Sequence, residues 1–453
     1  METKRSSFTG KLGFVLAAAG SAVGLGNIWR FPYLAAQYGG GIFLLVYLIL
    51  AVTFGFALML AEIAIGRKTG LSVVGAYKKL DKRFSFIGLL AAAVPIIILP
   101  YYCVIGGWVT KYMFAFATGD AGNAATDGYF NGFISNASEP LLWFAVFIGA
   151  TALVVLLGVD KGIEKISKII MPILIALTLF VAIYSICSMP GAIDGVLYYI
   201  TPDFSKFSVN TVLGAMGQLF YSMSIAMGIM ITYGSYMKKD VNIESSVHQI
   251  EIFDTGIAFL AGLMIIPTAY VFYGGNTESI GQGPGLMFAT LPKVFQTMPG
   301  GEIIGAVFFF MVFFAALTSS ISLMETVVSI FCDKFGWNRK LTCLFVIAIS
   351  IILGVPSSLG NGIWSEFTII GMDFLSFCDF LCNSVVMPIV ALLTCILVGY
   401  VIKPAAIVEE VELSAKFKNK AMFTFVIKYM APICIVLILV SSVLSGLGIV
   451  EGL

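Results

Sequence analysis

The chain contains eleven apolar runs of the length, about 20 residues, that a helix needs to cross a bilayer. Hydrophobic residues make up 59% of the chain and charged residues 11%, so charge is too sparse to cover a water-soluble surface. This excludes a soluble enzyme, a disordered chain and a disulfide scaffold, and it predicts an all-α integral membrane protein with eleven transmembrane helices. The predicted spans are 12–37, 41–66, 86–116, 141–158, 163–187, 208–236, 249–273, 302–332, 341–356, 374–401 and 421–449.

The basic residues predict the orientation of these spans. The connection at 67–85 holds six Lys and Arg residues, whereas 117–140 holds none, which places the first connection in the cytoplasm. The N-terminus is then inside and, with an odd number of spans, the C-terminus is outside. No connection is long enough for a separate aqueous domain, so residues 1–453 form one domain. The net charge of +1 gives no sign of nucleic-acid binding.

Two of the predicted spans have unusual sequences for a lipid-facing helix. The first contains GSAVGLGN (Gly20–Asn27), and the sixth contains GQLFYSMSIAMG (Gly217–Gly228). Gly weakens a helix, and unwound backbone persists inside a membrane only where it lines a cavity or meets a ligand. A small-residue helix contact is the alternative for either segment alone. However, the two spans open successive sets of five, and paired interrupted helices indicate a transporter site between two repeats.

Polar residues inside the spans indicate what such a site could bind. Glu62, Glu251, Asp254, Glu325, Asp373 and Asp379 fall within or at the ends of spans. Asp254 has no basic residue nearby in the sequence, so either a bound monovalent cation or a helix-to-helix hydrogen bond could compensate it. The run Thr318–Ser320 offers hydroxyl oxygens, which suit hard cations, although such hydroxyls also bond to the preceding helical turn.

Other classes of membrane protein fit these residues less well. The eight Cys show no zinc spacing, and His248 is the single His, which leaves little for an intramembrane enzyme. A channel would need a continuous polar lining, whereas the polar groups here gather at mid-depth. A nutrient sensor built like a transporter stays open as an alternative, although the chain shows no extra cytoplasmic domain.

Several motifs together resemble the neurotransmitter:sodium symporters. They are GSAVGLGNIWRFPYLAAQYGGGIFLLVY (Gly20–Tyr47), IGR (Ile65–Arg67), PYYCVIGGW (Pro100–Trp108), KGIEKISKIIMP (Lys161–Pro172), GQLFYSMSIAMG, ITYGSYMKKD (Ile231–Asp240) and ALTSSISLME (Ala316–Glu325). They match in order over nearly the whole chain, and eleven spans resemble the prokaryotic amino-acid transporters of this family. The resemblance implies two inverted five-helix repeats (about 12–187 and 208–401), discontinuous helices 1 and 6, and a peripheral helix (421–449).

The resemblance further implies sodium-driven uptake of an amino acid across the cytoplasmic membrane. The substrate carboxylate should meet Leu25, Gly26 and Tyr102, and its ammonium group Ala22, Tyr221, Ser222, Ser224 and Ser319. The side-chain pocket should be lined by Ser21, Ile98, Tyr102, Tyr221, Met227, Ser319 and Leu323. This apolar lining favours a branched-chain, Met or aromatic substrate. Tyr221 stands where the family usually has Phe, which could give the pocket a polar edge.

Two sodium ions and two gates also follow from the resemblance. The first sodium site should use Ala22, Asn27, Ser222 and Asp254, and the second Gly20, Val23, Ala315, Thr318 and Ser319. The outer gate should pair Arg30 with Asp379, with Asp373 as the weaker candidate; the inner gate should pair Arg5 with Asp333, beside Phe8 and Tyr236. Besides the substrate and the lipid bilayer, no obligatory protein partner is evident.

The resemblance also bears on chloride. Tyr47, Gln218 and Ser222 match chloride-binding positions of animal members, but Ala258 stands where those members have Ser. Asp254 supplies a fixed negative charge where chloride-dependent members have a neutral Asn. Transport is therefore predicted to be chloride-independent.

Overall fold

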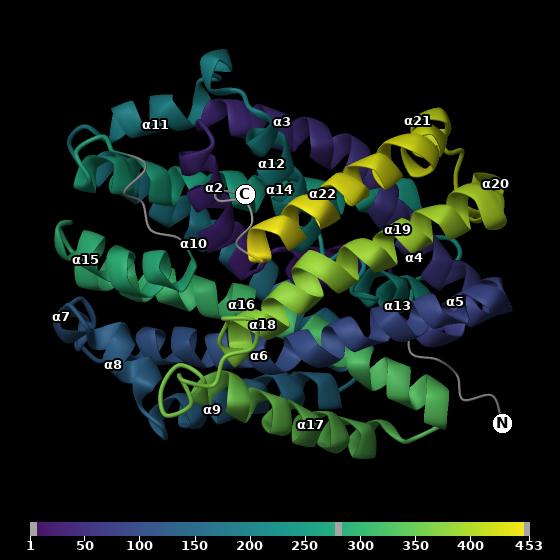
Figure 1. Ribbon diagram of the computed structural model, residues 1–453, viewed down its shortest axis with the longest axis horizontal. Helices are drawn as coiled ribbons and strands as arrows, with labels where there is room; N and C mark the ends of the chain where they lie inside the picture. Colours follow the sequence, from purple (N-terminus) through teal and green to yellow (C-terminus); the bar gives the residue numbers. More distant parts are fainter. Residues whose placement is uncertain (1–6, 277–282, 448–453) are drawn as a thin grey trace.

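The computed structural model describes residues 7–276 and 283–447. These residues are almost entirely helical, and the only β-type pairings among them are two isolated bridges, Gly40 with Pro202 and Ile369 with Met372. The helices run roughly side by side across the longest dimension of the molecule (Figure 1). The predicted all-helical class is confirmed.

Nine helices in the described part of the chain are long and apolar enough to cross a membrane. They comprise Gly41–Thr69 (α3, η2 and α4), Lys82–Ala117 (η3 and α6), Glu139–Leu156 (α9), Val159–Ser188 (η4 and α10), Ile243–Phe272 (α14), Gly301–Phe335 (α16), Arg339–Leu359 (α17), Phe374–Val401 (α18, η8, α19 and η9) and Lys420–Gly446 (α21, η10 and α22). Each coincides with a predicted span to within six residues at either end.

The two remaining predicted spans are broken, as their Gly-rich sequences suggested. The first consists of α1 (Lys11–Ala22), followed after three residues by η1 (Gly26–Arg30) and α2 (Phe31–Gln37), with a bend of 54°. Counting this pair gives up to ten crossings. The sixth consists of α12 (Val209–Ser222) and α13 (Ile229–Ser235), separated by residues 223–228. Since both pieces are short, an eleventh crossing stays a prediction.

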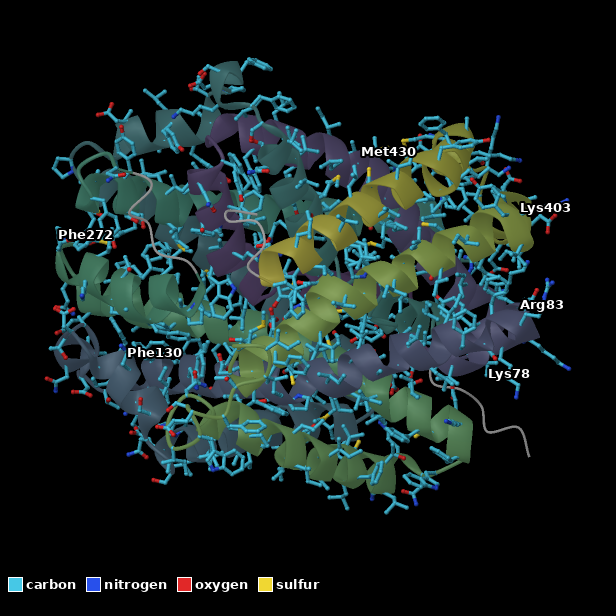
Figure 2. All side chains as sticks on the ribbon, viewed as in Figure 1. Lys78, Arg83, Phe130, Phe272, Lys403 and Met430 are labelled. Carbon is cyan, nitrogen blue, oxygen red and sulfur yellow. The ribbon has the colours of Figure 1, made fainter. Side chains whose placement is uncertain are left out.

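Short helices connect the spans. They are α5 (Val73–Leu80), α7 (Ala121–Ala124), α8 (Tyr129–Ser135), α11 (Ala192–Ile200), η5 (Phe204–Lys206), η7 (Gly285–Thr290), α15 (Leu291–Gln296) and α20 (Lys403–Glu412). The labelled basic residues Lys78, Arg83 and Lys403 lie at one end of the molecule, opposite Phe130 and Phe272 (Figure 2). This separation along the helix axes agrees with the charge asymmetry of the connections.

The packing places the broken helices inside the molecule and apolar side chains outside it. Helix α1 packs against α10, α14 and α16, and α16 packs along α6. Ten of the twelve residues of α1 are buried, and this helix carries no charge beyond Lys11. Large apolar side chains such as Leu153, Ile303 and Ile352 are more than 65% exposed, which is the surface expected where lipid tails surround a protein.

Glycines allow α4 and α13 to approach each other closely. A Cβ at Gly66 would lie 1.9 Å from the carbonyl oxygen of Ile231, and one at Gly234 would lie 2.3 Å from that of Ile63. Both obstacles are backbone atoms that cannot rotate away. Small residues of this kind permit close helix contacts in membranes.

We expect Gly66→Ala to lower the stability of the protein by about 1–3 kcal/mol, because the added methyl group forces α4 and α13 apart. Thermal unfolding in detergent would measure the loss. Gly149→Ala is the matched control, since a Cβ at Gly149 in α9 meets no atom within 4 Å. Equal melting temperatures for both variants would contradict this account of the contact.

Candidate functional site

A cavity lies at the level of the two helix breaks. Its lining comes from four separate parts of the chain. The lining residues are Ser21, Ala22, Gly24, Leu25, Gly26, Asn27, Ile98, Tyr102, Tyr221, Ser222, Ser224, Met227, Ile229, Ser319 and Leu323. Every residue predicted to contact a substrate is in this set, and Gly24, Asn27 and Ile229 are additional. The fold therefore brings the predicted set together, although its contact with a substrate stays a prediction.

None of the described residues that line the cavity carries a charge. Ile98, Met227 and Leu323 supply apolar surface, whereas serine hydroxyls and backbone groups supply polar atoms. Ser21 and Ser224 lie with their hydroxyl oxygens 3.2 Å apart, and the Ser224 hydroxyl donates to the carbonyl oxygen of Ser21 at 3.1 Å. A small ligand with a neutral side chain fits such a lining better than an acidic or basic one.

The first break exposes backbone groups to the cavity. The amide of Gly24 donates to Oδ1 of Asn27 at 3.1 Å, and Nε2 of Gln218 donates to the carbonyl oxygen of Gly26 at 3.0 Å. The Tyr102 hydroxyl faces Ser319 and the backbone of Leu25, yet it is buried without completing a hydrogen bond to the described residues. A polar ligand group at this break would satisfy that hydroxyl.

Gly24 keeps this part of the cavity open. A Cβ at position 24 would lie 2.7 Å from the hydroxyl oxygen of Ser319 and 3.1 Å from that of Tyr102. Any side chain would therefore push into the space between these two hydroxyls. Glycine is the residue that lets a ligand approach the backbone here.

The second break is strained, and a carboxylate holds it. Ser224 and Ala226 have φ angles of 53° and 63°, the left-handed region that side chains disfavour by about 1–3 kcal/mol. Glu62 in α4 accepts a hydrogen bond from the Ala226 amide at 2.7 Å and is 2% exposed. From the sequence, Glu62 was merely one of six carboxylates in the spans. Nothing in the sequence singles out Glu62 for this role, because the contact joins segments 164 residues apart.

Asp254 is a fully buried carboxylate with neutral partners. Its Oδ1 accepts from Nδ2 of Asn27 at 2.8 Å and from the Ser222 hydroxyl at 2.7 Å, while its Oδ2 accepts from the Tyr47 hydroxyl at 3.3 Å. Within the described residues it forms no ion pair with a basic side chain. Of the four residues predicted for the first sodium site, Asn27 and Ser222 thus both bond to Asp254. The fourth, Ala22, lines the adjoining cavity.

The oxygens predicted for the second sodium site also lie close together. The Ser319 hydroxyl oxygen is 3.5 Å from the carbonyl oxygen of Gly20 and 3.4 Å from that of Val23. The Thr318 hydroxyl donates to the carbonyl oxygen of Ala315 at 3.1 Å, so bonding within its own helix, the alternative considered for this residue, is present. A hydroxyl that donates keeps lone pairs for a cation, and a sodium site formed by these five residues stays a prediction.

Ser320 does not take part in this oxygen set. Its hydroxyl bonds to that of Thr151 in α9 at 2.8 Å and to the carbonyl oxygen of Leu317 at 2.9 Å. Of the hydroxyl run identified in the sequence, two members therefore face the break in α1, and the third joins two helices.

Comparisons with known proteins agree with this geometry. Residues 5–131 and 133–447 match the sequence model of the sodium:neurotransmitter symporter family. The chain belongs to this family. An uncharacterized sodium-dependent transporter of Bacillus subtilis, YhdH, is 32% identical over 98% of both chains. The sodium-dependent serotonin transporter of Drosophila melanogaster is 27% identical over 80% of this chain and 65% of that protein. The crystal structure of MhsT in complex with L-phenylalanine has a TM-score of 0.87 and 38% identity, covering 97% of this chain and 100% of that chain.

Membership of the family assigns the protein to the sodium-dependent membrane transporters rather than to the enzymes. The cavity between the broken helices is therefore the candidate site for a transported substrate. Contacts at the two ends of such a cavity bear on how a substrate would enter and leave it.

At the end of the molecule near α5 and α20, Phe8 is packed among aromatic side chains. This side chain is 1% exposed and packs edge-on against Phe14, Tyr233 and Tyr236, with ring centroids 5.6–6.2 Å apart. The amide of Phe8 also donates to the carbonyl oxygen of Tyr236 at 3.1 Å. Arg5, predicted to form the inner gate, lies outside the described residues. Its predicted partner, Asp333, accepts a hydrogen bond from the Ser72 amide at 2.7 Å.

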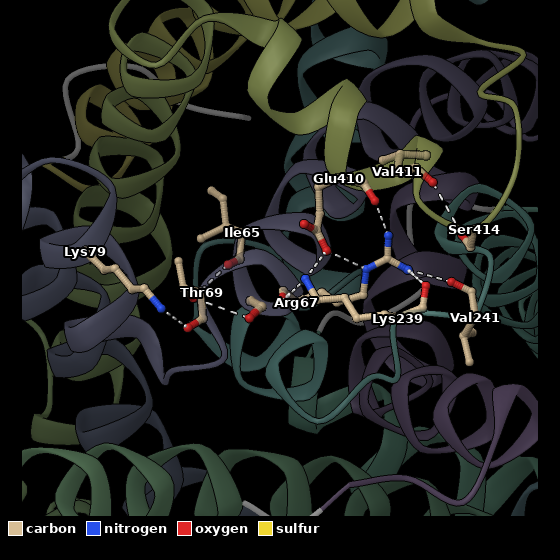
Figure 3. A network of polar contacts seen from close by, with 10 residues as sticks. Ile65, Arg67, Thr69, Lys79, Lys239, Val241, Glu410, Val411 and Ser414 are labelled. Carbon is tan, nitrogen blue, oxygen red and sulfur yellow. Dashed lines mark hydrogen bonds and ion pairs between the residues drawn. The ribbon is translucent and has the colours of Figure 1, made fainter.

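The same end carries a polar network that the sequence did not predict (Figure 3). Arg67 in α4 is buried and bonds to the carboxylate of Glu410 in α20 at 2.9 Å and to the carbonyl oxygen of Val241 at 2.6 Å. Lys239 reaches the same carboxylate at 2.7 Å. Because these residues join α4, the connection after α13 and α20, the network holds three separate segments together.

At the other end, the predicted outer gate is not in direct contact in this structure. Arg30 donates to the carbonyl oxygen of Gly217 at 3.3 Å, and its guanidinium group lies 5.7 Å from the centre of the Tyr221 ring. Among the described residues, Arg30 and Asp379 form no ion pair. Asp373, the weaker candidate, caps α18 (Phe374–Asp379) by accepting from the Ser376 amide at 3.1 Å.

Proposed function

We propose that this symporter takes up a hydrophobic L-amino acid, branched-chain or aromatic, together with sodium. The observation that carries the proposal is the buried carboxylate of Asp254, which has no basic partner among the described residues and adjoins an uncharged cavity. A charge at that depth costs about 2.5–3.5 kcal/mol without compensation, and a bound monovalent cation provides the compensation. The phenylalanine in the MhsT structure supports a hydrophobic amino acid as the substrate.

The substrate's two charges have matching places in the cavity. The carboxylate would meet the backbone at Leu25 and Gly26 and the unpartnered Tyr102 hydroxyl, all of which line the cavity. The ammonium group would meet the oxygens near Ala22 and Ser319. The remaining oxygens predicted for the ammonium group come from Tyr221, Ser222 and Ser224. The side chain would lie in the pocket formed by Ser21, Ile98, Tyr102, Tyr221, Met227, Ser319 and Leu323.

Sodium and substrate would stabilise each other's binding. The first sodium site (Ala22, Asn27, Ser222 and Asp254) lies beside the cavity, and the substrate carboxylate would complete it. The second site (Gly20, Val23, Ala315, Thr318 and Ser319) joins the α1 break to α16. Binding at one site thereby raises affinity at the other, and the coupling is reciprocal. Two sodium ions per substrate are proposed on this basis.

We further propose the family's full architecture for this chain. One domain, 1–453, would contain two inverted repeats of five helices, about 12–187 and 208–401, with the helix at 421–449 at the periphery. The breaks in the first and sixth spans, at corresponding positions of the two repeats, support this division. The protein would lie in the cytoplasmic membrane with its N-terminus inside and C-terminus outside, because Lys78, Arg83 and Lys403 mark one end (Figure 2).

Transport is proposed to be independent of chloride. The Tyr47 and Ser222 hydroxyls both donate to Asp254, and Nε2 of Gln218 donates to Gly26. The donors that would hold chloride are therefore already engaged, two of them by a fixed negative charge. The fixed charge of Asp254 would already balance the proposed sodium ion, so no chloride is needed for that purpose.

The test is uptake of labelled L-phenylalanine, L-leucine and L-tryptophan into sodium-free liposomes that contain the purified protein. We expect accumulation with an inward sodium gradient and none with an inward potassium gradient, and the preferred label identifies the substrate. Replacement of chloride by gluconate should leave the rate unchanged. Sodium-dependent binding without accumulation would indicate a sensor, and a large loss of rate in gluconate would refute chloride independence.

A further inference from the structure

Asp379 is held from two sides by polar neighbours. Its Oδ1 accepts from the Tyr101 hydroxyl at 2.9 Å and from Nδ2 of Asn383 at 2.7 Å. Its Oδ2 has no hydrogen-bond partner among the described residues. Tyr101 belongs to α6, whereas Asn383 belongs to η8 (Phe380–Val386), one turn after Asp379. One oxygen of the carboxylate is thus fixed by two donors, and the other is left to accept.

Asn383 presents a second free acceptor beside it. An ionised carboxylate only accepts hydrogen bonds, so the amide atom that faces Asp379 must be the nitrogen, which fixes the orientation of the Asn383 side chain. Its Oδ1 is then buried without a partner among the described residues. Buried amide oxygens normally accept a hydrogen bond. The Asn383 oxygen lacks one in this arrangement and can therefore accept from a donor that moves toward it.

Arg30 carries donors that have no partner in this arrangement. A guanidinium group has five N–H donors in a planar fork. Here its single hydrogen bond within the described residues is the 3.3 Å contact from Nη1 to Gly217, with the Tyr221 ring at 5.7 Å. Arg30 and Asp379 attract each other electrostatically without touching. Arg30 therefore has free donors within electrostatic reach of Asp379, whose neighbour Asn383 holds a second free acceptor.

We propose that Asn383 is the second half of the receptor for Arg30 in the outer gate. When the gate closes, the guanidinium fork would bond to Oδ2 of Asp379 and to Oδ1 of Asn383 together, while Tyr101 keeps the Asp379 carboxylate in place. The spacing of one helical turn puts both acceptors on the same face. A paired contact is more directional than a single ion pair. This inference rests on the proposed function, because the gate encloses the substrate that the cavity binds.

The experiment measures the rate at which bound, labelled L-phenylalanine leaves the protein in the presence of sodium. Asn383→Leu keeps the side-chain volume and removes both the free Oδ1 acceptor and the Nδ2 donor to Asp379, so the closed gate weakens. We expect release to become about 5- to 10-fold faster. In an Arg30→Met background, which already lacks the gate, the same substitution should change the rate by less than about twofold.

Tyr101→Phe distinguishes a direct role of Asn383 in the gate from a role in holding Asp379 in place. It removes one hydrogen bond to Oδ1 of Asp379 but leaves the Asn383 acceptor. We expect a smaller acceleration than with Asn383→Leu. Should Asn383→Leu fail to fold, Asn383→Ala takes its place. The inference is overturned if Asn383→Leu releases substrate at the wild-type rate, or if its effect persists at full size in Arg30→Met. If the wild-type protein itself shows no sodium-dependent binding of L-phenylalanine, L-leucine or L-tryptophan, the proposed function is overturned instead.

Discussion

Asp254→Asn is expected to abolish sodium-driven accumulation of substrate while leaving the protein folded. The substitution keeps the size and shape of the side chain and removes its charge. In the native site, the carboxylate is fully buried and accepts from Asn27, Ser222 and Tyr47. These neutral donors orient the carboxylate but leave its charge to be balanced by a cation. Without that charge, sodium loses the one anionic ligand that the protein supplies to the first site.

The expected size follows from the cost of breaking a buried charge pair, about 3–5 kcal/mol. That corresponds to a sodium affinity weaker by at least about 100-fold. Because sodium and substrate bind as coupled ligands, substrate binding at ordinary sodium concentrations should fall with it. Binding of labelled substrate at graded sodium chloride, with choline chloride holding ionic strength constant, measures both effects.

The same substitution distinguishes a cation site from a simple helix contact. If Asp254 served to join helices by hydrogen bonds, an amide could replace much of that role and the sodium response would be unchanged. That result would remove the observation on which the proposed function rests. Asp194→Asn is the matched control, because it makes the same chemical change at an exposed position in α11. It should leave the sodium response as in the wild type.

The spans could be predicted because a helix that crosses the bilayer must be both long enough and apolar enough, and both properties can be read from the sequence. A run such as 86–116 has no polar interruption long enough to end a helix, and the structure has α6 at Ser85–Ala117. The breaks could be predicted too, because Gly-rich sequence weakens a helix at the very depth where a membrane supplies no water to unwound backbone. The short helices that cap the ends, such as α8 and α11, were not predicted, because no periodic signal of useful length marks them.

The cavity lining could be predicted from motifs, whereas the contacts around it could not. Ser319 and Thr318 face the α1 break, whereas their neighbour Ser320 bonds to Thr151. The sequence of these three hydroxyl residues does not indicate which of them faces the break. Arg30 and Asp379 are separated here because a gate contact depends on the conformation and not on the sequence alone. Contacts of this kind are set by packing between distant segments.

Glu62 is the clearest residue of this type, and its replacement is the second large effect that we expect. Residues 223–228 have left the helical hydrogen-bond pattern, and Ser224 and Ala226 adopt left-handed conformations. The Ala226 amide has the Glu62 carboxylate as its acceptor, at 2.7 Å. Because Ser224 and Met227 on either side of Ala226 line the cavity, Glu62 supports the wall of the proposed substrate pocket.

Glu62→Leu should therefore leave the Ala226 amide without an acceptor inside the protein. An unpaired buried donor costs about 1–3 kcal/mol, and the strained segment would relax to avoid that cost. We expect the affinity for L-phenylalanine to fall about 5- to 150-fold. The loss should appear in equilibrium binding at saturating sodium, which separates it from a loss of sodium affinity.

Glu62→Gln provides the discriminating comparison, because a glutamine carbonyl can accept the same hydrogen bond at the same place. It should retain most of the binding that Glu62→Leu loses, which shows that the acceptor matters rather than the charge. An equal loss in both variants would instead assign the role to the carboxylate's charge. Wild-type affinity in Glu62→Leu would mean that the Ala226 amide finds another acceptor, and that the segment at 223–228 holds its shape without α4.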